Sequence, residues 1–218
     1  MALWRREFLG LTLAALSGGG ASAAPSAKAK GDAKDEKDAW LDQGGQRHRI
    51  IFDSVSTKGA GEALNFADNF YKANLSGYGV QAKDMSVVII LRHYAVVFGF
   101  NDAAWAKFGA ALSDWGQLAE IGMTQATANV YNASPLDPKL SSRGRTLKGV
   151  TEQGARFAVC EVAAQAVAFM VSKASGADAK AVLEELRANL IPSAVMVPAG
   201  IVTLNRAQER GYTVSICG

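Results

Sequence analysis

The segment from residue 85 to residue 91 (MSVVIIL) constrains the fold more than any other part of the chain. It is apolar on both faces, whereas a strand with one face in water alternates apolar and polar side chains. A strand that must be covered on both faces is typical of the centre of a parallel sheet with helices on each side. The segment therefore predicts an α/β fold.

Further short runs of branched and apolar residues, bounded by turn residues, predict strands at 49–55, 156–160, 194–197 and 212–216. Helical spacing of apolar side chains predicts helices at 62–75, 102–108, 114–121, 161–173, 179–190 and 201–210. Asn101 and Ser113 are expected to cap two of them, while Gly59 and Gly61 are expected to form a turn. The alternation predicts a single three-layer α/β domain with a mainly parallel sheet of four to five strands.

Residues 1–23 have the three parts of an export signal. Arg5 and Arg6 supply the basic start, residues 8–16 are apolar, and residues 21–23 (ASA) are small enough for cleavage. The arginine pair resembles the twin-arginine (Tat) signal; a general secretory signal and an uncleaved anchor are the alternatives. We expect a periplasmic protein with no membrane segment in its mature form, since residues 8–16 are too short to span a bilayer and no other apolar run is long enough.

The remaining chain divides into a linker and a domain. Residues 24–39 are mostly Ala, Lys, Asp and Glu without a large apolar side chain, so they are expected to form a flexible charged linker. Residues 40–218 are expected to form the α/β domain.

Composition and spacing exclude several classes of function. The 23 basic and 20 acidic residues give a net charge of +3, which is too balanced for a nucleic-acid-binding surface. Two cysteines and two histidines without metal-ligand spacing predict no metal site. The segment 59–64 (GAGEAL) lacks the last small residue of a dinucleotide fingerprint, so no cofactor is predicted.

Ligands of open parallel sheets bind outside the carboxyl ends of the strands. That edge is expected to carry Asp53, Arg92, His93, Cys160 and residues 198–200. Cys160 would also stand at a helix N-terminus, where the helix dipole favours an anion such as a thiolate. Two other interpretations of Cys160 stay open: a buried hydrophobic side chain, and a disulfide with the near-terminal Cys217.

The two histidines are expected to lie at opposite edges of the sheet. His93 follows a strand and is a candidate general acid or base, or a cationic partner for a thiolate; the alternative is a structural residue. His48 precedes the first strand and is expected at the amino-terminal edge, away from the site.

The order of these motifs resembles the DsrE/DsrF-like family of sulfur-relay proteins, and in particular its exported members. The likeness rests on residues 49–53 (RIIFD), 86–93 (ending LRH), 157–160 (FAVC) and 195–200 (VMVPAG). The resemblance implies that Cys160 holds sulfane sulfur as a persulfide, and that the protein forms homo-oligomers and exchanges sulfur with donor and acceptor proteins or small sulfur compounds.

The residues and the family resemblance together lead to three alternative functions. The first is a periplasmic sulfur carrier or sulfurtransferase with Cys160 as the reacting group, His93 as a thiolate partner and Asp53 as an orienting group. The second is a non-catalytic binding or assembly module that uses the same crevice. The third is a redox protein that cycles a Cys160–Cys217 disulfide.

Overall fold

A computed structural model describes residues 36–45, 47–132, 137 and 139–218. Five strands form one parallel sheet in the order β4-β3-β2-β1-β5. They are β1 (His48–Ser54), β2 (Met85–Leu91), β3 (Arg156–Cys160), β4 (Ala194–Val197) and β5 (Thr213–Cys217). The predicted α/β class is confirmed. The predicted export signal, residues 1–23, lies outside the described residues.

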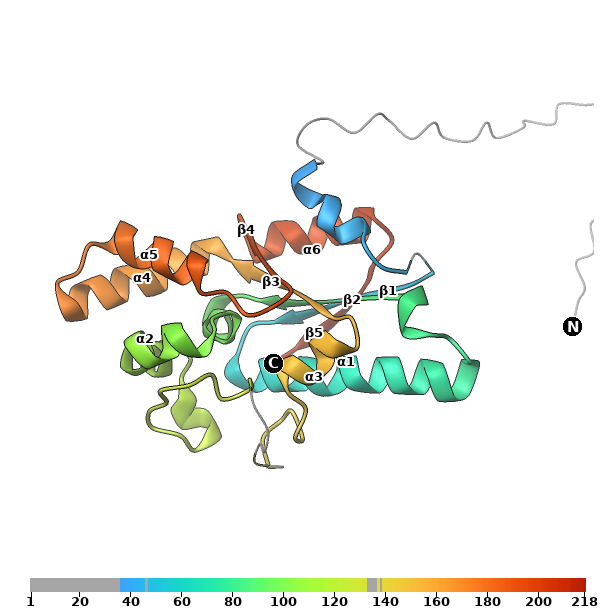
Figure 1. Cartoon of the computed structure of the whole chain (residues 1–218), viewed down its shortest axis with the longest axis horizontal. Coiled ribbons are helices and arrows are strands. Elements are labelled where there is room, and N and C mark those ends of the chain that lie inside the picture. Colours follow the sequence, from blue (N-terminus) through green and yellow to red (C-terminus); the bar gives the residue numbers. More distant parts are fainter. Residues whose placement is uncertain (1–35, 46, 133–136, 138) are drawn as a thin grey trace, which may run out of the picture.

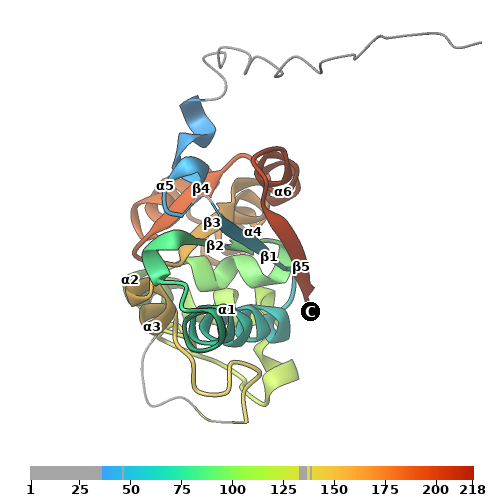
Figure 2. The same cartoon turned by 90° about the vertical axis from the view of Figure 1, so that its right-hand side faces the viewer.

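Helices cover both faces of this sheet (Figures 1 and 2). They are α1 (Thr57–Tyr78), α2 (Asp102–Trp115), α3 (Leu147–Glu152), α4 (Glu161–Ser175), α5 (Ala179–Ala188) and α6 (Gly200–Glu209), with 3-10 turns η1 (Glu36–Asp42), η2 (Ala82–Asp84), η3 (His93–Gly99) and η4 (Leu118–Ile121). The chain proceeds from β1 to β4 in one direction and then returns to β5. With right-handed crossovers, that reversal places α6 on the face opposite α1, as Figure 2 shows.

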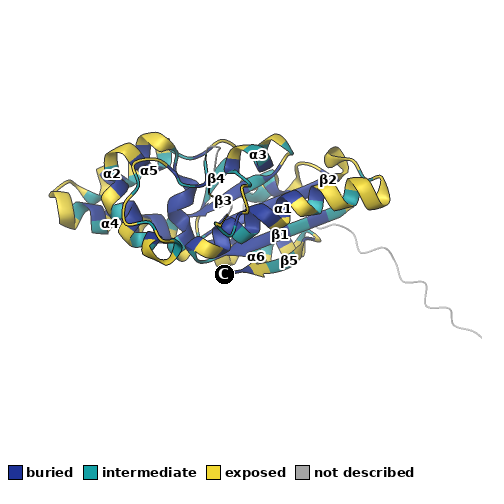
Figure 3. Ribbon diagram, turned by 90° about the horizontal axis from the view of Figure 1, so that it is seen from below, coloured by how far each residue is buried: buried dark blue, intermediate teal, exposed yellow. Residues whose placement is uncertain are grey.

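Strand β2 is the centre of the core, as its sequence predicts, and all seven of its residues are buried. Val88 and Ile90 pack with Ala158 and Ala207 on the α6 face, while Ile89 belongs to the larger cluster beneath α1, α2 and α4. Figure 3 shows the sheet and the inner helix faces as buried and the outer helix faces as exposed. No helix in the described part of the chain combines the length and the apolar character needed to cross a membrane.

Helix α1 begins five residues earlier than predicted, so Gly59 and Gly61 lie inside the helix and not in a turn. Ser56 caps the helix by accepting a hydrogen bond from the Gly59 N–H at 2.9 Å. A Cβ on Gly59 would lie 2.4 Å from the Cys217 carbonyl oxygen. This glycine is therefore needed for the close approach of α1 to β5.

The two short helices predicted at 102–108 and 114–121 are instead the continuous helix α2 followed by the short turn η4. Asn101 caps α2 as predicted, through hydrogen bonds from the N–H groups of Ala103 and Ala104. Ser113 is not a cap: it lies within α2, and its hydroxyl accepts a hydrogen bond from the Ala126 N–H at 2.9 Å. The predicted capping role of Ser113 is therefore wrong, because its hydroxyl forms a tertiary contact with Ala126.

Helical structure also begins before residue 40. Glu36–Asp42 form η1, so residues 36–39 of the expected linker are helical. Asp38 forms an ion pair with Arg206 of α6 at 3.5 Å, and the Tyr212 hydroxyl donates a hydrogen bond to the Leu41 carbonyl at 2.6 Å. These contacts hold η1 beside α6. They stabilise a helical turn that the composition of residues 24–39 did not predict.

Candidate functional site

The carboxyl ends of β1, β2 and β3 meet at one edge of the sheet, as the parallel pairing requires. Asp53 is paired with Ile90, and Leu91 is paired with Val159. Asp53, Arg92 and Cys160 therefore gather at this edge, whereas His48 begins β1 at the opposite edge.

Asp53 and Arg92 form a two-pronged ion pair at the centre of this edge. Arg92 donates from Nε to Oδ1 at 2.7 Å and from Nη2 to Oδ2 at 2.8 Å. The Asp53 side chain is 3% exposed and the Arg92 side chain 28% exposed, so the carboxylate is buried and the guanidinium reaches the surface. Asp53 thus holds the Arg92 guanidinium at this edge of the sheet.

Gly200, the first residue of α6, fixes where the Arg92 side chain lies. A Cβ on Gly200 would lie 2.9 Å from Cδ of Arg92 and 2.9 Å from Cγ2 of Ile90. No larger residue fits here without a shift of these neighbours. The segment 198–200, expected at the site from sequence, contributes this close approach of α6 to Arg92.

Cys160 ends β3 and is the N-terminal cap residue of α4. It is 7% exposed and lines a cavity of about 660 Å³ together with Arg92, His93 and Trp115. The first turns of α4 and α6 complete the cavity wall, through Val162, Ala163, Ala166, Ala199, Gly200 and Ile201. The thiol is thus neither on the open surface nor sealed in the core.

His93 lines the same cavity but makes a different set of contacts from those expected. It is exposed, with a positive φ of 54°, and its ring lies 3.9 Å from that of Tyr94. Its carbonyl accepts a hydrogen bond from Nε1 of Trp115 at 2.9 Å. Within the described chain no hydrogen bond joins the His93 ring to Cys160, although both residues line the cavity.

Arg92 is the cation with an electrostatic link to Cys160. The hydrogen bonds to Asp53 raise the pKa of the Arg92 guanidinium above its usual range, and the charges of Asp53 and of an ionised Cys160 add to this, while burial opposes it. Nη1 of Arg92 makes no hydrogen bond to the described residues. This nitrogen remains for an anion in the cavity.

Two helix N-termini reinforce that positive character. Neither α4 nor α6 has a side-chain hydrogen bond at its N-terminal cap, where Cys160 and Ala199 stand. The free N–H groups of a first helical turn favour negative charge nearby. Arg92 and these two helix starts together make the cavity suited to an anionic group beside a thiol.

Cys217 lies in a different environment. It ends β5, is 1% exposed, and burial raises the pKa of its thiol to about 12, with smaller contributions from the charges of Glu62 and Asp53. Both cysteines are free. Strands β2 and β1 separate β3 from β5, a distance of roughly 14 Å at about 4.8 Å per strand, and a disulfide requires Cα atoms within about 7 Å. The Cys160–Cys217 pair of the redox alternative is incompatible with this sheet.

No protein-family model, curated protein or solved structure matches the chain. Across the described ranges, no group of three or more His, Cys, Asp or Glu side chains is placed to hold a metal ion.

Exposed apolar side chains of α4 and α6 lie at the cavity wall, through Val162 and Ile201, and further along the same helices. Val162 and Phe169 of α4 are each 59% exposed, and Ile201 and Val202 of α6 are 57% and 50% exposed. Helix α5 packs against α4, as Figure 1 shows, and the two apolar side chains of α4 remain exposed beside it. Exposed apolar side chains that gather around a cavity are typical of a protein contact surface.

Sequence reasoning placed Arg92 at this edge but gave it no role. One signal was available: Asp53 and Arg92 stand at the ends of adjacent predicted strands, where a carboxylate and a guanidinium can pair. The contact between Gly200 and Arg92 had no such signal, because it depends on how closely α6 approaches β2.

Proposed function

We propose that the protein is a sulfur carrier or sulfurtransferase in which Cys160 holds sulfane sulfur as a persulfide. One observation carries the proposal: the Cys160 thiol opens into a cavity that also contains the Arg92 guanidinium and the N-termini of α4 and α6. The resemblance of the sequence to DsrE/DsrF-like proteins supports the same chemistry.

The positive groups of the cavity suit an anionic sulfur donor such as thiosulfate or polysulfide. The Cys160 thiolate attacks the outer sulfur of thiosulfate and forms an S–S bond, while the sulfur–sulfur bond of the donor breaks. Sulfite leaves with the electron pair, and the charge of −1 stays on the terminal sulfur of the persulfide. Arg92 and the helix N-termini stabilise the anions before and after transfer.

Release follows the same chemistry in the other direction. A thiolate of the acceptor attacks the terminal sulfur of the persulfide, forms a new persulfide and returns Cys160 as a thiolate. The apolar surface of Val162, Phe169, Ile201 and Val202 would hold a protein acceptor or a second copy of the chain over the opening. In keeping with the expected export signal, we place this exchange in the periplasm.

The test is the intact mass of the protein after incubation with thiosulfate or polysulfide. We expect a mass increase of one or more sulfur atoms that is removed by a reducing agent. Cys160→Ala should abolish the adduct, and Cys217→Ala is the matched control that should keep it. An unmodified wild-type protein under conditions that load a known carrier would refute the proposal.

A second candidate, an assembly module without sulfur chemistry, is favoured by the four exposed apolar residues of α4 and α6. It predicts a stable oligomer that Phe169→Glu dissociates, measured by light scattering, and a Cys160 that never accepts sulfur. A monomeric wild-type protein would eliminate this candidate.

A further inference from the structure

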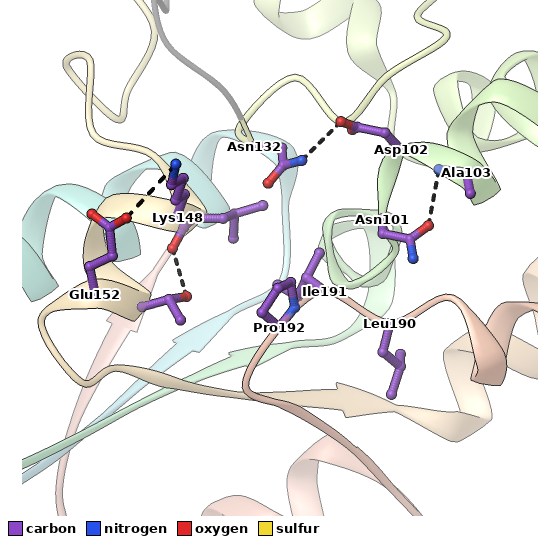
Figure 4. Close-up of a pocket in the computed structure, with 11 residues that line it drawn as sticks. Asn101, Asp102, Ala103, Asn132, Lys148, Glu152, Leu190, Ile191 and Pro192 are labelled. Atoms are coloured by element: carbon purple, nitrogen blue, oxygen red, sulfur yellow. Dashed lines mark hydrogen bonds and ion pairs between the residues drawn. The ribbon is translucent and has the colours of Figure 1, made fainter.

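A second cavity, of about 580 Å³, lies apart from Cys160 and shares no residue with the first (Figure 4). It is enclosed by the start of α2, by α3 and by residues 190–192, which lead into β4. Its volume lies within the range of small-molecule sites, about 300–1,000 Å³.

The floor of this cavity is apolar and is held in place by the backbone. Leu147 and Ile191 are each 3% exposed, and Leu190 and Pro192 extend the same surface. The Ile191 N–H donates to the Gly99 carbonyl at 2.9 Å, and the Asn101 N–H donates to the Asn189 carbonyl at 2.8 Å. These bonds tie residues 189–191 to the start of α2 and fix this side of the cavity.

Two amide side chains line the cavity: Asn101 presents a hydrogen-bond donor and Asn132 presents an acceptor. Oδ1 of Asn101 accepts from the first turn of α2. Its Nδ2 has no partner among the described residues and points towards Leu190 in Figure 4. Nδ2 of Asn132 donates to Oδ2 of Asp102 at 3.0 Å, which leaves its Oδ1 directed towards the space between Lys148 and Ile191. Each amide is oriented by the bond that its other atom makes.

The charges at the rim do not favour an ionic ligand. Lys148 and Glu152 face each other at 3.9 Å, and both are more than half exposed. Asp102 already accepts hydrogen bonds at both oxygens, from the Asn129 N–H and from Asn132. An anion would meet two carboxylates and one ammonium, while a cation would gain only partners that water screens.

We infer that this cavity binds a small uncharged ligand with an apolar ring or chain and a carboxamide-like head group. The apolar part would lie on Leu147, Leu190 and Ile191. The carbonyl of the head group would accept from Nδ2 of Asn101, and its N–H would donate to Oδ1 of Asn132. This inference is independent of the sulfur chemistry proposed for Cys160.

Benzamide is a suitable probe, because it joins an apolar ring to a primary amide. In ¹H–¹⁵N correlation spectra of the full chain, millimolar benzamide should shift the amide signals of residues 101–103, 147–152 and 190–191. N,N-dimethylbenzamide keeps the ring but lacks the N–H donor, so it should bind about tenfold more weakly.

Variants distinguish this site from nonspecific binding. Ala103→Trp and Thr151→Phe fill the cavity from opposite walls and should abolish the shifts, whereas Ala103→Ser is the matched control that retains them. Asn101→Asp keeps the helix cap but removes the donor, and should weaken benzamide about tenfold. Circular dichroism checks that each variant is folded.

Three results would overturn the inference: no shift in the wild-type protein, shifts that persist in both filled variants, or equal binding of the two benzamides. The last result would mean that the cavity selects only for apolar shape.

Discussion

Replacement of Arg92 by Met tests the ion pair on which the site is built. The Met side chain keeps most of the apolar stem of Arg92 but leaves both oxygens of Asp53, a 3% exposed side chain, without their present partner. Removal of one partner from a buried ion pair costs about 3–5 kcal/mol. Because the Arg92 side chain is 28% exposed and water reaches part of the pair, we expect a loss of about 2–3 kcal/mol.

The assay is urea unfolding at pH 7, followed by circular dichroism. The matched control is Lys58→Met, which removes an ion pair with Glu62 at 3.6 Å in which Lys58 is 68% exposed, and it should cost under about 1 kcal/mol. The double variant Asp53→Asn with Arg92→Met removes both charges and should be more stable than Arg92→Met alone. A cost for Arg92→Met equal to that of the control would refute the claim that Asp53 is a buried charge held by Arg92.

The remaining predictions concern three other positions. Gly200→Ala places a methyl group 2.9 Å from the Arg92 side chain and should slow sulfur loading of Cys160 several-fold, measured by intact mass, with little loss of helix content; an unchanged rate would separate Arg92 from the chemistry. For Cys217, the raised pKa of about 12 against an ordinary 9.0 means that the unfolded chain loses a proton above pH 9 that the native state keeps, so stability falls between about pH 9 and 12. Cys217→Ala should therefore lose less stability over that pH range, and equal losses in urea unfolding would contradict the assignment. Asp68→Asn should cost about 1–3 kcal/mol at pH 7, since ion pairs with Lys72 and Arg145 hold the pKa of this buried carboxyl below 3.8 despite burial. Its native pKa is lowered, so the difference from wild type should shrink as pH falls below about 4 and should not grow.

The strands could be predicted from sequence because each is short, branched and bounded by turn residues. Met85–Leu91 and Arg156–Cys160 match the observed strands residue for residue, and the strand-end rule then brought Asp53, Arg92 and Cys160 to one edge. Local pattern was sufficient because strand order and helix crossovers follow from a small set of chain rules.

The errors have a different origin, since each depends on contacts between segments far apart in the chain. Gly59 was predicted in a turn because its packing against β5 is not visible in the sequence. Ser113 was predicted as a cap because its contact with Ala126 is not visible there either. The Asp53–Arg92 ion pair likewise joins two strands that are distant in the chain, and it orients the guanidinium, while the His93 ring packs on Tyr94.

The central claim is that the Cys160 thiol can be reached from the cavity while the protein is folded. The most direct measurement is peptide mapping after brief exposure of the native protein to iodoacetamide, with the urea-unfolded protein as the reference for full labelling. Labelling of Cys160 well before Cys217 is the predicted result. If both cysteines stay unlabelled until the protein unfolds, the cavity does not admit even a small reagent to Cys160, and the proposed sulfur chemistry is contradicted.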